Sequence, residues 1–170
     1  MDADTFRRAC GVLAELHRSG HEVRADESGL HIKPRMPERL RAKVVPYRDE
    51  LVELLAGADT AALAAMSFEE FEASRSAVAV FSTALKETVV FVSDDDMAGR
   101  AYDAGLVPYT AAELRTIATD GREALALIHG AKLRLLHEAK AVFRGEIIAN
   151  PRVEVEIAAL PARAGGERGV

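Results

Sequence analysis

The sequence predicts an α+β protein with two units in series, a small α-β-β-α-α unit at residues 1–57 and a small α/β unit at residues 67–150. Three patterns support this prediction. Apolar residues recur at helical spacing over residues 3–18, two short segments between residues 21 and 34 alternate apolar with polar side chains, and residues 88–92 form a continuous β-branched run. Residues 58–66 are expected to be a linker with a short helix, and residues 151–170 a partly disordered tail.

The first helix is expected over residues 3–18. Phe6, Cys10 and Leu13 fall on its apolar face, so we interpret Cys10, the only cysteine, as a small core residue. The helix should end at Gly20, because glycine accepts the left-handed conformation that closes many helices.

A β-hairpin should follow, with strands at residues 21–25 and 30–34 and a four-residue loop from Asp26 to Gly29. Alternation gives each strand an apolar and a polar side. The apolar side holds Val23, Ala25, Leu30 and Ile32, and the polar side holds Glu22, Arg24, His31 and Lys33. A two-stranded hairpin is marginal in water by itself, so it should lie on the helices with at least one strand border open.

Two short helices at residues 37–44 and 47–55 complete the first unit. Pro37 suits the first turn of one helix, and Pro46 separates the two.

The second unit is expected to contain strands at residues 77–81, 88–92 and 106–109, and a last strand at residues 146–149. Helices are expected after Ser67, over residues 94–104, and from Thr110, which has capping-box spacing to Glu113. A longer helix should run from residue 121 or 122 to residue 143, with Gly130 bending or interrupting it. Its inner stripe is expected to be Leu125, Ile128, Leu135, Ala139 and Val142.

Composition excludes several classes of protein. The formal net charge is −5, which disfavours a general attraction to nucleic acid, although Arg39, Arg41, Lys43 and Arg48 keep a non-catalytic DNA-associated role open. A single cysteine excludes a disulfide framework within the chain. The acidic start is unlike a signal peptide, and the apolar runs are too short to span a membrane. We therefore expect a cytoplasmic protein.

One segment offers an enzymatic alternative. Asp94 and Asp96 follow a predicted strand in the sequence SDDDMAGR, which is similar to the metal-binding turn of TOPRIM nucleic-acid enzymes and would hold Mg²⁺ through carboxylate oxygens. TOPRIM chemistry also needs a Glu-Gly turn on an earlier strand, and no Glu-Gly pair precedes Asp94. The simpler interpretation is that these aspartates cap a helix.

Residues of about 3–55 resemble the TubC-type N-terminal docking domains of modular peptide and polyketide synthases. The resemblance depends on the order and spacing of LAELHRSGHEVRA, SGLHIKP and PERLRAKVVPYRDELVELL. Two features differ from the family: the loop between Lys33 and Pro37 is short, and residues 1–170 include no synthase domain. The second half, including VPYTAAEL at residues 107–114, is similar to uncharacterised bacterial proteins, which implies no activity.

The docking-domain resemblance implies β-augmentation, in which the hairpin pairs with a short C-terminal peptide of a partner, and several family members are homodimers. The residues implied for partner binding are Arg24, Leu30, His31, Ile32, Lys33 and Arg35. The positive charge of Arg24, His31, Lys33 and Arg35 would suit an acidic peptide, although charged side chains also solvate the outer face of an ordinary hairpin. We therefore predict a non-catalytic docking or adaptor protein without a cofactor, and keep the Mg²⁺-dependent TOPRIM-like reading as the alternative.

Overall fold

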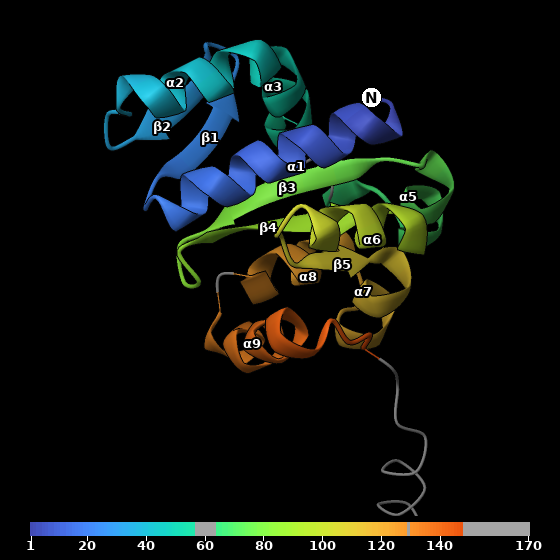
Figure 1. Cartoon of the computed structure of the whole chain (residues 1–170). Coiled ribbons are helices and arrows are strands. Elements are labelled where there is room, and N and C mark those ends of the chain that lie inside the picture. The colour runs from blue at the N-terminus through green and yellow to red at the C-terminus, as the bar shows by residue number, and fades with distance from the viewer. Residues whose placement is uncertain (57–63, 129, 148–170) are drawn as a thin grey trace, which may run out of the picture.

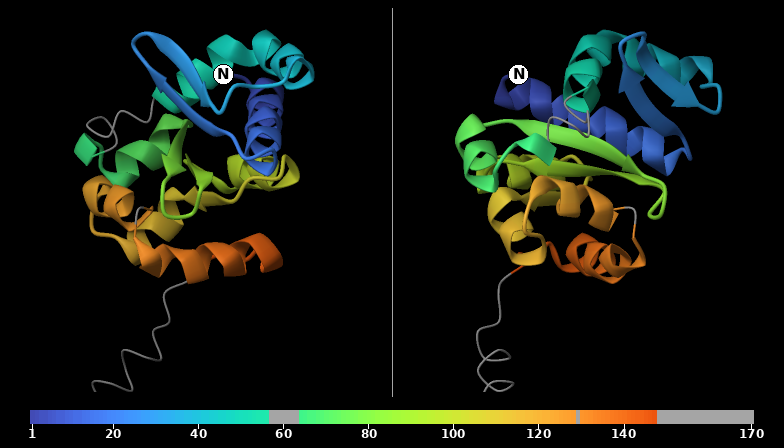
Figure 2. Two further views of the ribbon diagram at one scale, coloured as in Figure 1. Left: turned by 90° about the vertical axis from the view of Figure 1, so that its left-hand side faces the viewer. Right: turned by 180° about the vertical axis from the view of Figure 1, so that it is seen from behind.

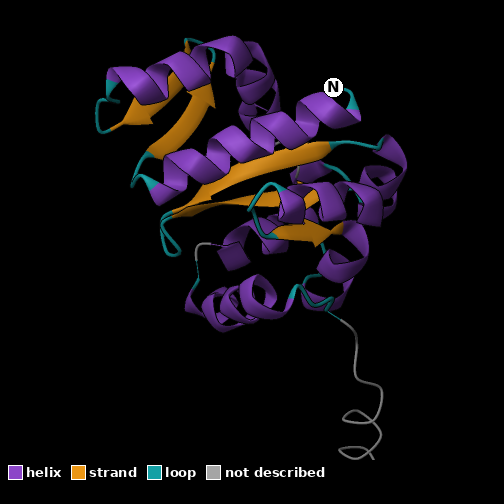
Figure 3. Cartoon of the chain, in the orientation of Figure 1, coloured by secondary structure: helices purple, strands orange, loops and turns teal. Residues whose placement is uncertain are grey.

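The computed structural model of the chain describes residues 1–56, 64–128 and 130–147, and it confirms the mixed α+β class (Figure 1). The described strands form two separate sheets, a two-stranded one and a three-stranded one with the order β3-β4-β5 (Figure 3). In the described part of the chain no helix has both the length and the apolarity needed to cross a bilayer.

The N-terminal elements follow the predicted order. They are α1 (Ala3–Arg18), β1 (Glu22–Asp26), β2 (Gly29–Lys33), α2 (Glu38–Val44), the 3-10 turn η1 (Val45–Tyr47) and α3 (Arg48–Ala56). The side chain of Asp2 accepts hydrogen bonds from the backbone of Asp4 and Thr5 and so starts α1. Pro37 is the N-cap of α2 instead of its first-turn residue, and Pro46 lies inside η1, where a proline is tolerated.

The C-terminal elements form the second sheet and the helices around it. They are α5 (Phe68–Ser74), β3 (Ala77–Ser82), β4 (Glu87–Val92), α6 (Asp95–Asp103), β5 (Pro108–Thr110), α7 (Ala111–Ile117), α8 (Gly121–Ile128) and α9 (Ala131–Phe143). Complete capping boxes start α5 at Ser67, with Glu70, and α7 at Thr110, with Glu113, and the second of them was predicted from its spacing. The third strand is displaced from its predicted place at residues 106–109, because it pairs with β4 only from Pro108 to Thr110.

Strand β4 is the centre of the larger sheet. It pairs antiparallel with β3 and parallel with β5. Val89, Val90, Phe91 and Val92 are all 0% exposed, which confirms the buried strand predicted from the β-branched run. Both faces of this strand are therefore covered by other elements.

One hydrophobic core joins the two halves of the chain. Ala79, Val90 and Val92 on one face of the sheet belong to the same cluster as Leu13 of α1 and Leu54 of α3. Figure 1 shows α1 lying across the sheet, with the hairpin, α2 and α3 beyond it. The expected division near residue 57 thus separates two parts of the sequence that share one core.

Cys10 is also part of this shared core and is fully buried, as expected. Burial raises the pKa of its thiol to about 12, so the sulfur stays protonated and unreactive at neutral pH.

The opposite face of the sheet carries Val78, Val80, Val89 and Phe91, which pack in a second cluster. Residues of α5, α7, α8 and α9 complete that cluster. In the views of Figures 1 and 2, α9 and the hairpin lie at opposite ends of the molecule.

The apolar stripe predicted for the last long helix is wrong beyond Gly130. Leu125 and Ile128 are buried, but Leu135 and Val142 are 77% and 74% exposed, and Ala139 is exposed as well. Helix α8 ends at Ile128 and Gly130 is the N-cap of α9, so the predicted helix is interrupted at Gly130, which is one of the two expected outcomes there. The inner stripe was predicted by continuing the helical spacing from α8 past Gly130. Because α9 is a separate helix, this spacing does not identify its buried residues.

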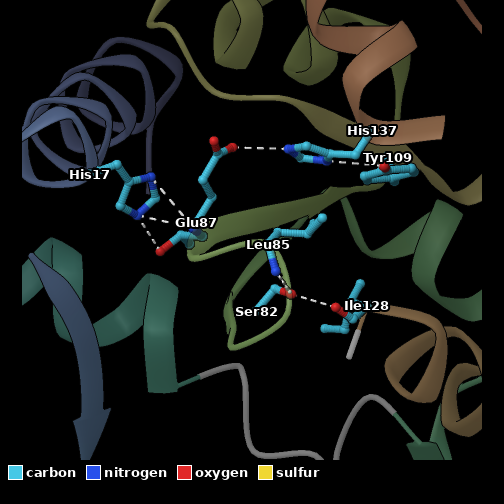
Figure 4. A network of polar contacts seen from close by, with 8 residues as sticks. His17, Ser82, Leu85, Glu87, Tyr109, Ile128 and His137 are labelled. Carbon is cyan, nitrogen blue, oxygen red and sulfur yellow. Dashed lines mark hydrogen bonds and ion pairs between the residues drawn. The ribbon is translucent and has the colours of Figure 1, made fainter. Parts of the chain in front are cut away.

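Helix α9 instead buries polar groups against the sheet. Lys140 forms an ion pair with Glu113. His137 hydrogen-bonds to the Tyr109 hydroxyl at 3.1 Å and to Glu87 at 3.0 Å (Figure 4). Burial lowers the pKa of Lys140, although Glu113 opposes that shift, and burial raises the pKa of Tyr109. Counting apolar residues cannot find such a buried face, because it assigns Lys and His to solvent.

Some expected features cannot be compared with the structure. The linker at residues 58–63 and the tail at residues 151–170 lie outside the described residues. Of the expected strand at residues 146–149, Glu146 and Ile147 are described and lie in no strand.

A histidine of α1 connects the N-terminal half to β4. The Nε2 atom of His17 lies 2.7 Å from the Thr88 hydroxyl, and the Thr88 N–H donates to the same nitrogen at 3.0 Å (Figure 4). Burial lowers the pKa of His17 from 6.5 to about 4, with Glu87 opposing that shift. The folded protein therefore holds His17 neutral at a pH where the unfolded chain would protonate it.

This difference predicts a loss of stability in acid. Between pH 6.5 and 4 the unfolded state binds a proton on His17 that the folded state does not bind, so the free energy of unfolding falls as the pH falls. We expect the wild type to lose about 2 kcal/mol more than His17→Gln between pH 7.5 and 4.5. Urea unfolding of both proteins at the two pH values measures this difference, and equal losses would contradict the assignment.

Candidate functional site

The β1–β2 hairpin is closed by a shorter turn than expected. Asp26 pairs directly with Gly29, so only Glu27 and Ser28 form the loop, and not the four residues predicted. Gly29 has a φ of +118°, which a residue with a side chain rarely adopts. The Asp26 carboxylate accepts hydrogen bonds from the Ser28 N–H at 2.8 Å and from its hydroxyl at 2.7 Å.

His31 also binds Asp26, with 2.9 Å between its Nε2 atom and the carboxylate oxygen. The hydrogen bonds from Ser28 and then His31 lower the pKa of Asp26 to about 2. The turn is thus held by polar contacts of its own side chains, which sets the register of the two strands.

The apolar face of the hairpin anchors it to the body. Val23 is fully buried, and Ala25, Leu30 and Ile32 are half-buried against the shared core, as their alternation predicts. Helix α3 contacts both strands. The hairpin is therefore supported along its length on one face.

The two borders of the hairpin differ. In the described part of the chain no further strand pairs with β1 or β2. Strand β1 contacts α1, α3 and β3, whereas the main contact of β2 outside the hairpin is α3. The border of β2 is therefore the more open one.

The register shows which backbone groups this border presents. The two residues that flank a two-residue turn exchange hydrogen bonds, and along an antiparallel pair such positions alternate with positions whose groups point outward. Starting from the Asp26–Gly29 pair, His31 is directed toward β1, and Leu30 and Ile32 direct their N–H and C=O groups away from it. Leu30 and Ile32 thus combine an inward side chain with an outward backbone.

The polar face of the hairpin is balanced in charge, unlike the positive patch expected from the sequence. Arg24 forms an ion pair with Glu22 at 2.5 Å, and its guanidinium lies 5.8 Å from the ring centre of Phe81. His31 is bound to Asp26. A hollow of about 470 Å³ over this face is lined by Glu22, Arg24, Asp26, His31 and Lys33, which are two carboxylates, two cations and a histidine.

The structure places all six predicted partner-binding residues on the hairpin or directly after it. Leu30 and Ile32 lie on the half-buried face, Arg24, His31 and Lys33 lie exposed on the polar face, and Arg35 is exposed beyond β2. Lys33 and Arg35 are the predicted cations that form no ion pair with a described residue. Positive charge available to a partner is therefore concentrated where β2 ends.

Sequence reasoning did not find that the second half of the chain borders the hairpin. Phe81, at the end of β3, lies beneath Arg24, and Lys86 lies in the β3–β4 turn. Both residues line a second hollow beside the base of the hairpin, together with Lys33. No local signal marks them, because they are far from residue 33 in the sequence.

The two aspartates of the enzymatic alternative have structural partners. Asp94 is the N-cap of α6 and accepts a hydrogen bond from the Met97 N–H at 3.0 Å. Asp96 forms an ion pair with Arg100 one turn later at 3.0 Å. Among the residues that the structure describes, no three His, Cys, Asp or Glu side chains gather as a metal site would require.

The basic residues considered for DNA association lie on α2 and at the start of α3. Lys43 is paired with Glu15 of α1 at 2.6 Å, and the guanidinium of Arg48 lies close to Gly29. Arg39 and Arg41 are exposed on α2.

No protein-family model matches this sequence, and comparisons with curated proteins and with solved structures give no match. The geometry of the hairpin therefore carries the functional argument, and the docking-domain resemblance stays a prediction.

The capping contact of Asp94 leads to a stability prediction. Asp94→Ala should lower the free energy of unfolding by about 1 kcal/mol, because the Met97 N–H loses its acceptor. Asp96→Ala should cost less than about 0.5 kcal/mol, because it removes only an exposed pair one helical turn apart. Urea unfolding of both variants measures these losses, and equal losses would contradict the cap.

A thermal-shift measurement in millimolar Mg²⁺ tests the alternative at the same residues. Stabilisation of the wild type that is absent from the Asp94→Asn/Asp96→Asn double variant would support the metal site instead.

Proposed function

We propose that this protein is a non-catalytic docking protein that binds an extended peptide of a partner by adding a strand to the open border of β2. The observation that carries the proposal is the outward direction of the Leu30 and Ile32 backbone groups on a border that no described strand occupies. Unpaired N–H and C=O groups in a row are a template for a foreign strand.

The support beneath the hairpin makes such a border suitable for binding. An isolated two-stranded ribbon would be marginally stable, and a partner would have to supply the cost of ordering it. Here Val23, Leu30 and Ile32 hold the ribbon against the core, and Asp26 holds its turn. The binding edge is therefore ordered before the partner arrives.

The charges beside the border give a choice of partner. Since Arg24 and His31 are already bound to acidic neighbours, they contribute little net attraction to an acidic peptide. Lys33 and Arg35 remain, both near the end of β2. An acidic group at one end of the docked peptide suits this distribution better than a uniformly acidic one.

A second copy of this chain is the other candidate source of the partner strand. Two β2 borders would then pair around a twofold axis, which gives a closed, self-complementary interface. We take the peptide of another protein as the proposal and the homodimer as an outcome of its test.

The test replaces one outward N–H. Ile32→Pro removes a donor from the open border but no hydrogen bond between β1 and β2, because Ile32 faces away from β1. Its control, Ile32→Ala, loses a larger part of the apolar side chain and keeps the N–H. Peptides selected from a display library with free C-termini serve as probes, with affinity measured by fluorescence anisotropy.

We expect Ile32→Pro to weaken peptide binding about tenfold or more and Ile32→Ala to weaken it less. Circular dichroism and thermal unfolding must show that both variants remain folded. Equal affinities of wild type and a folded Ile32→Pro variant would contradict docking on this border. Sedimentation that shows a wild-type dimer and an Ile32→Pro monomer would assign the border to self-association instead.

A further inference from the structure

A second hollow lies beside the base of the hairpin and joins the two halves of the chain. It has a volume of about 440 Å³. Its lining residues include Gly20, His21, Lys33 and Pro34 from the first half, and Phe81 and Lys86 from the second. Because Lys33 also lines the hollow over the polar face, the two spaces adjoin each other. We call the second one the Lys33–Lys86 hollow.

Two lysines line this hollow. Lys33 and Lys86 are both exposed, and neither forms an ion pair with a described residue. The acidic neighbours of the two lysines are already used: Glu22 is bound to Arg24, and Glu87 is bound to His137. The positive charge of the pair is therefore available to a ligand.

The backbone at Lys86 is itself unusual. Its φ is +60°, in the left-handed region that glycine and asparagine adopt far more readily than lysine. The turn that imposes this conformation is closed by a hydrogen bond of 2.9 Å from the Lys86 N–H to the Ser82 carbonyl. Arg75 and Arg144 adopt the same region at the ends of α5 and α9, so the conformation of Lys86 describes a tight turn and is not by itself a sign of a site.

His21 is a third residue of the hollow with unpaired polar atoms. It is 6% exposed, and its two ring nitrogens are buried and have no hydrogen-bond partner in the described part of the chain. Buried polar atoms normally have a partner, because leaving one unpaired is costly. A ligand in the hollow would pair with these nitrogens only after the ring turned toward it.

We propose that the Lys33–Lys86 hollow binds a carboxylate, held between the Lys33 and Lys86 ammonium groups beside the His21 ring. The carrier of that carboxylate is the peptide docked on β2, and this part rests on the proposed function. The open border of β2 ends at Lys33, which also lines the hollow, and the proposal therefore places one end of the docked strand there. The second half of the chain would thus take part in recognising the partner.

A singly charged carboxylate fits this site better than a phosphate. Glu22 also lines the hollow, and although it is paired with Arg24 its charge opposes a dianion more strongly than a monoanion. Both the C-terminal carboxylate of a peptide and the side chain of an acidic residue have the required chemistry. The experiments below distinguish these two sources.

The first experiment needs no partner. Sodium acetate is titrated into the full chain and followed by ¹H–¹⁵N NMR, with sodium chloride at equal ionic strength as the control. We expect saturable shifts of the His21, Lys33 and Lys86 amide signals with acetate alone. We expect Lys86→Asn to lose them, because asparagine accepts the left-handed backbone but carries no charge. Lys86→Arg, which keeps the charge, should retain them.

Shifts that are absent, or that persist unchanged in Lys86→Asn, would overturn the site. Lys33→Gln provides a second variant on the other wall of the hollow, so the test does not depend on one turn residue. Thermal unfolding identifies any variant that is not folded.

The second experiment uses a peptide selected on the wild type, prepared with a free and with an amidated C-terminus. Lys86→Asn should weaken the free peptide about tenfold. If amidation of the peptide costs as much and abolishes the effect of Lys86→Asn, the terminal carboxylate is the ligand. If amidation has no effect but replacing an acidic side chain by its amide does, the side chain is the ligand.

Failure of this inference is separable from failure of the docking proposal. A peptide that binds equally to wild type and Lys86→Asn, yet loses affinity with Ile32→Pro, would overturn the hollow and leave docking on β2 intact.

Discussion

The burial of β4 on both faces is the constraint on which the rest of the structure depends. A strand that presents Val89, Val90, Phe91 and Val92 needs an apolar cover on each side, because exposing such a run to water is costly. Helices α1, α3 and α6 supply residues to one cover, and α5, α7, α8 and α9 to the other. Since α1 and α3 also flank the hairpin in the sequence, covering β4 places the hairpin at the edge of the body.

Burial of this strand also explains how the two covers are held together. Neighbouring residues at the start of β4 bind opposite sides of the molecule: Thr88 hydrogen-bonds to His17 of α1, and Glu87 binds His137 of α9 (Figure 4). On the α9 side, Lys140 and Glu113 add a buried ion pair. Such a pair contributes little net stability but is costly to break, so it specifies the position of α9 more than it strengthens the fold.

The hairpin combines support with exposure. Its apolar side chains are bound to the core, while the backbone of Leu30 and Ile32 points to an unoccupied border. A sheet edge of this kind is normally shielded, because it invites aggregation, and its retention here is the physical basis for assigning it a partner. The nearby Lys33–Lys86 hollow adds a charged end to this edge, so backbone pairing would provide affinity and the carboxylate site would provide direction.

Much of this architecture was predictable from the sequence, because local signals specify local structure. Apolar periodicity located α1, alternation assigned Val23 and Ile32 to the inner face of the hairpin, and the spacing from Thr110 to Glu113 started α7. These features depend on residues within a few positions of one another, so one sequence is enough to find them.

Only the tertiary structure decided which distant groups meet. It placed Lys86 and Lys33 along one hollow, paired Arg24 with Glu22 on the expected positive face, and turned Leu135 outward while Lys140 went inward. The physical reason is that burying a charge depends on a partner such as Glu113, and a hollow depends on two walls, each supplied by a chain segment remote in sequence.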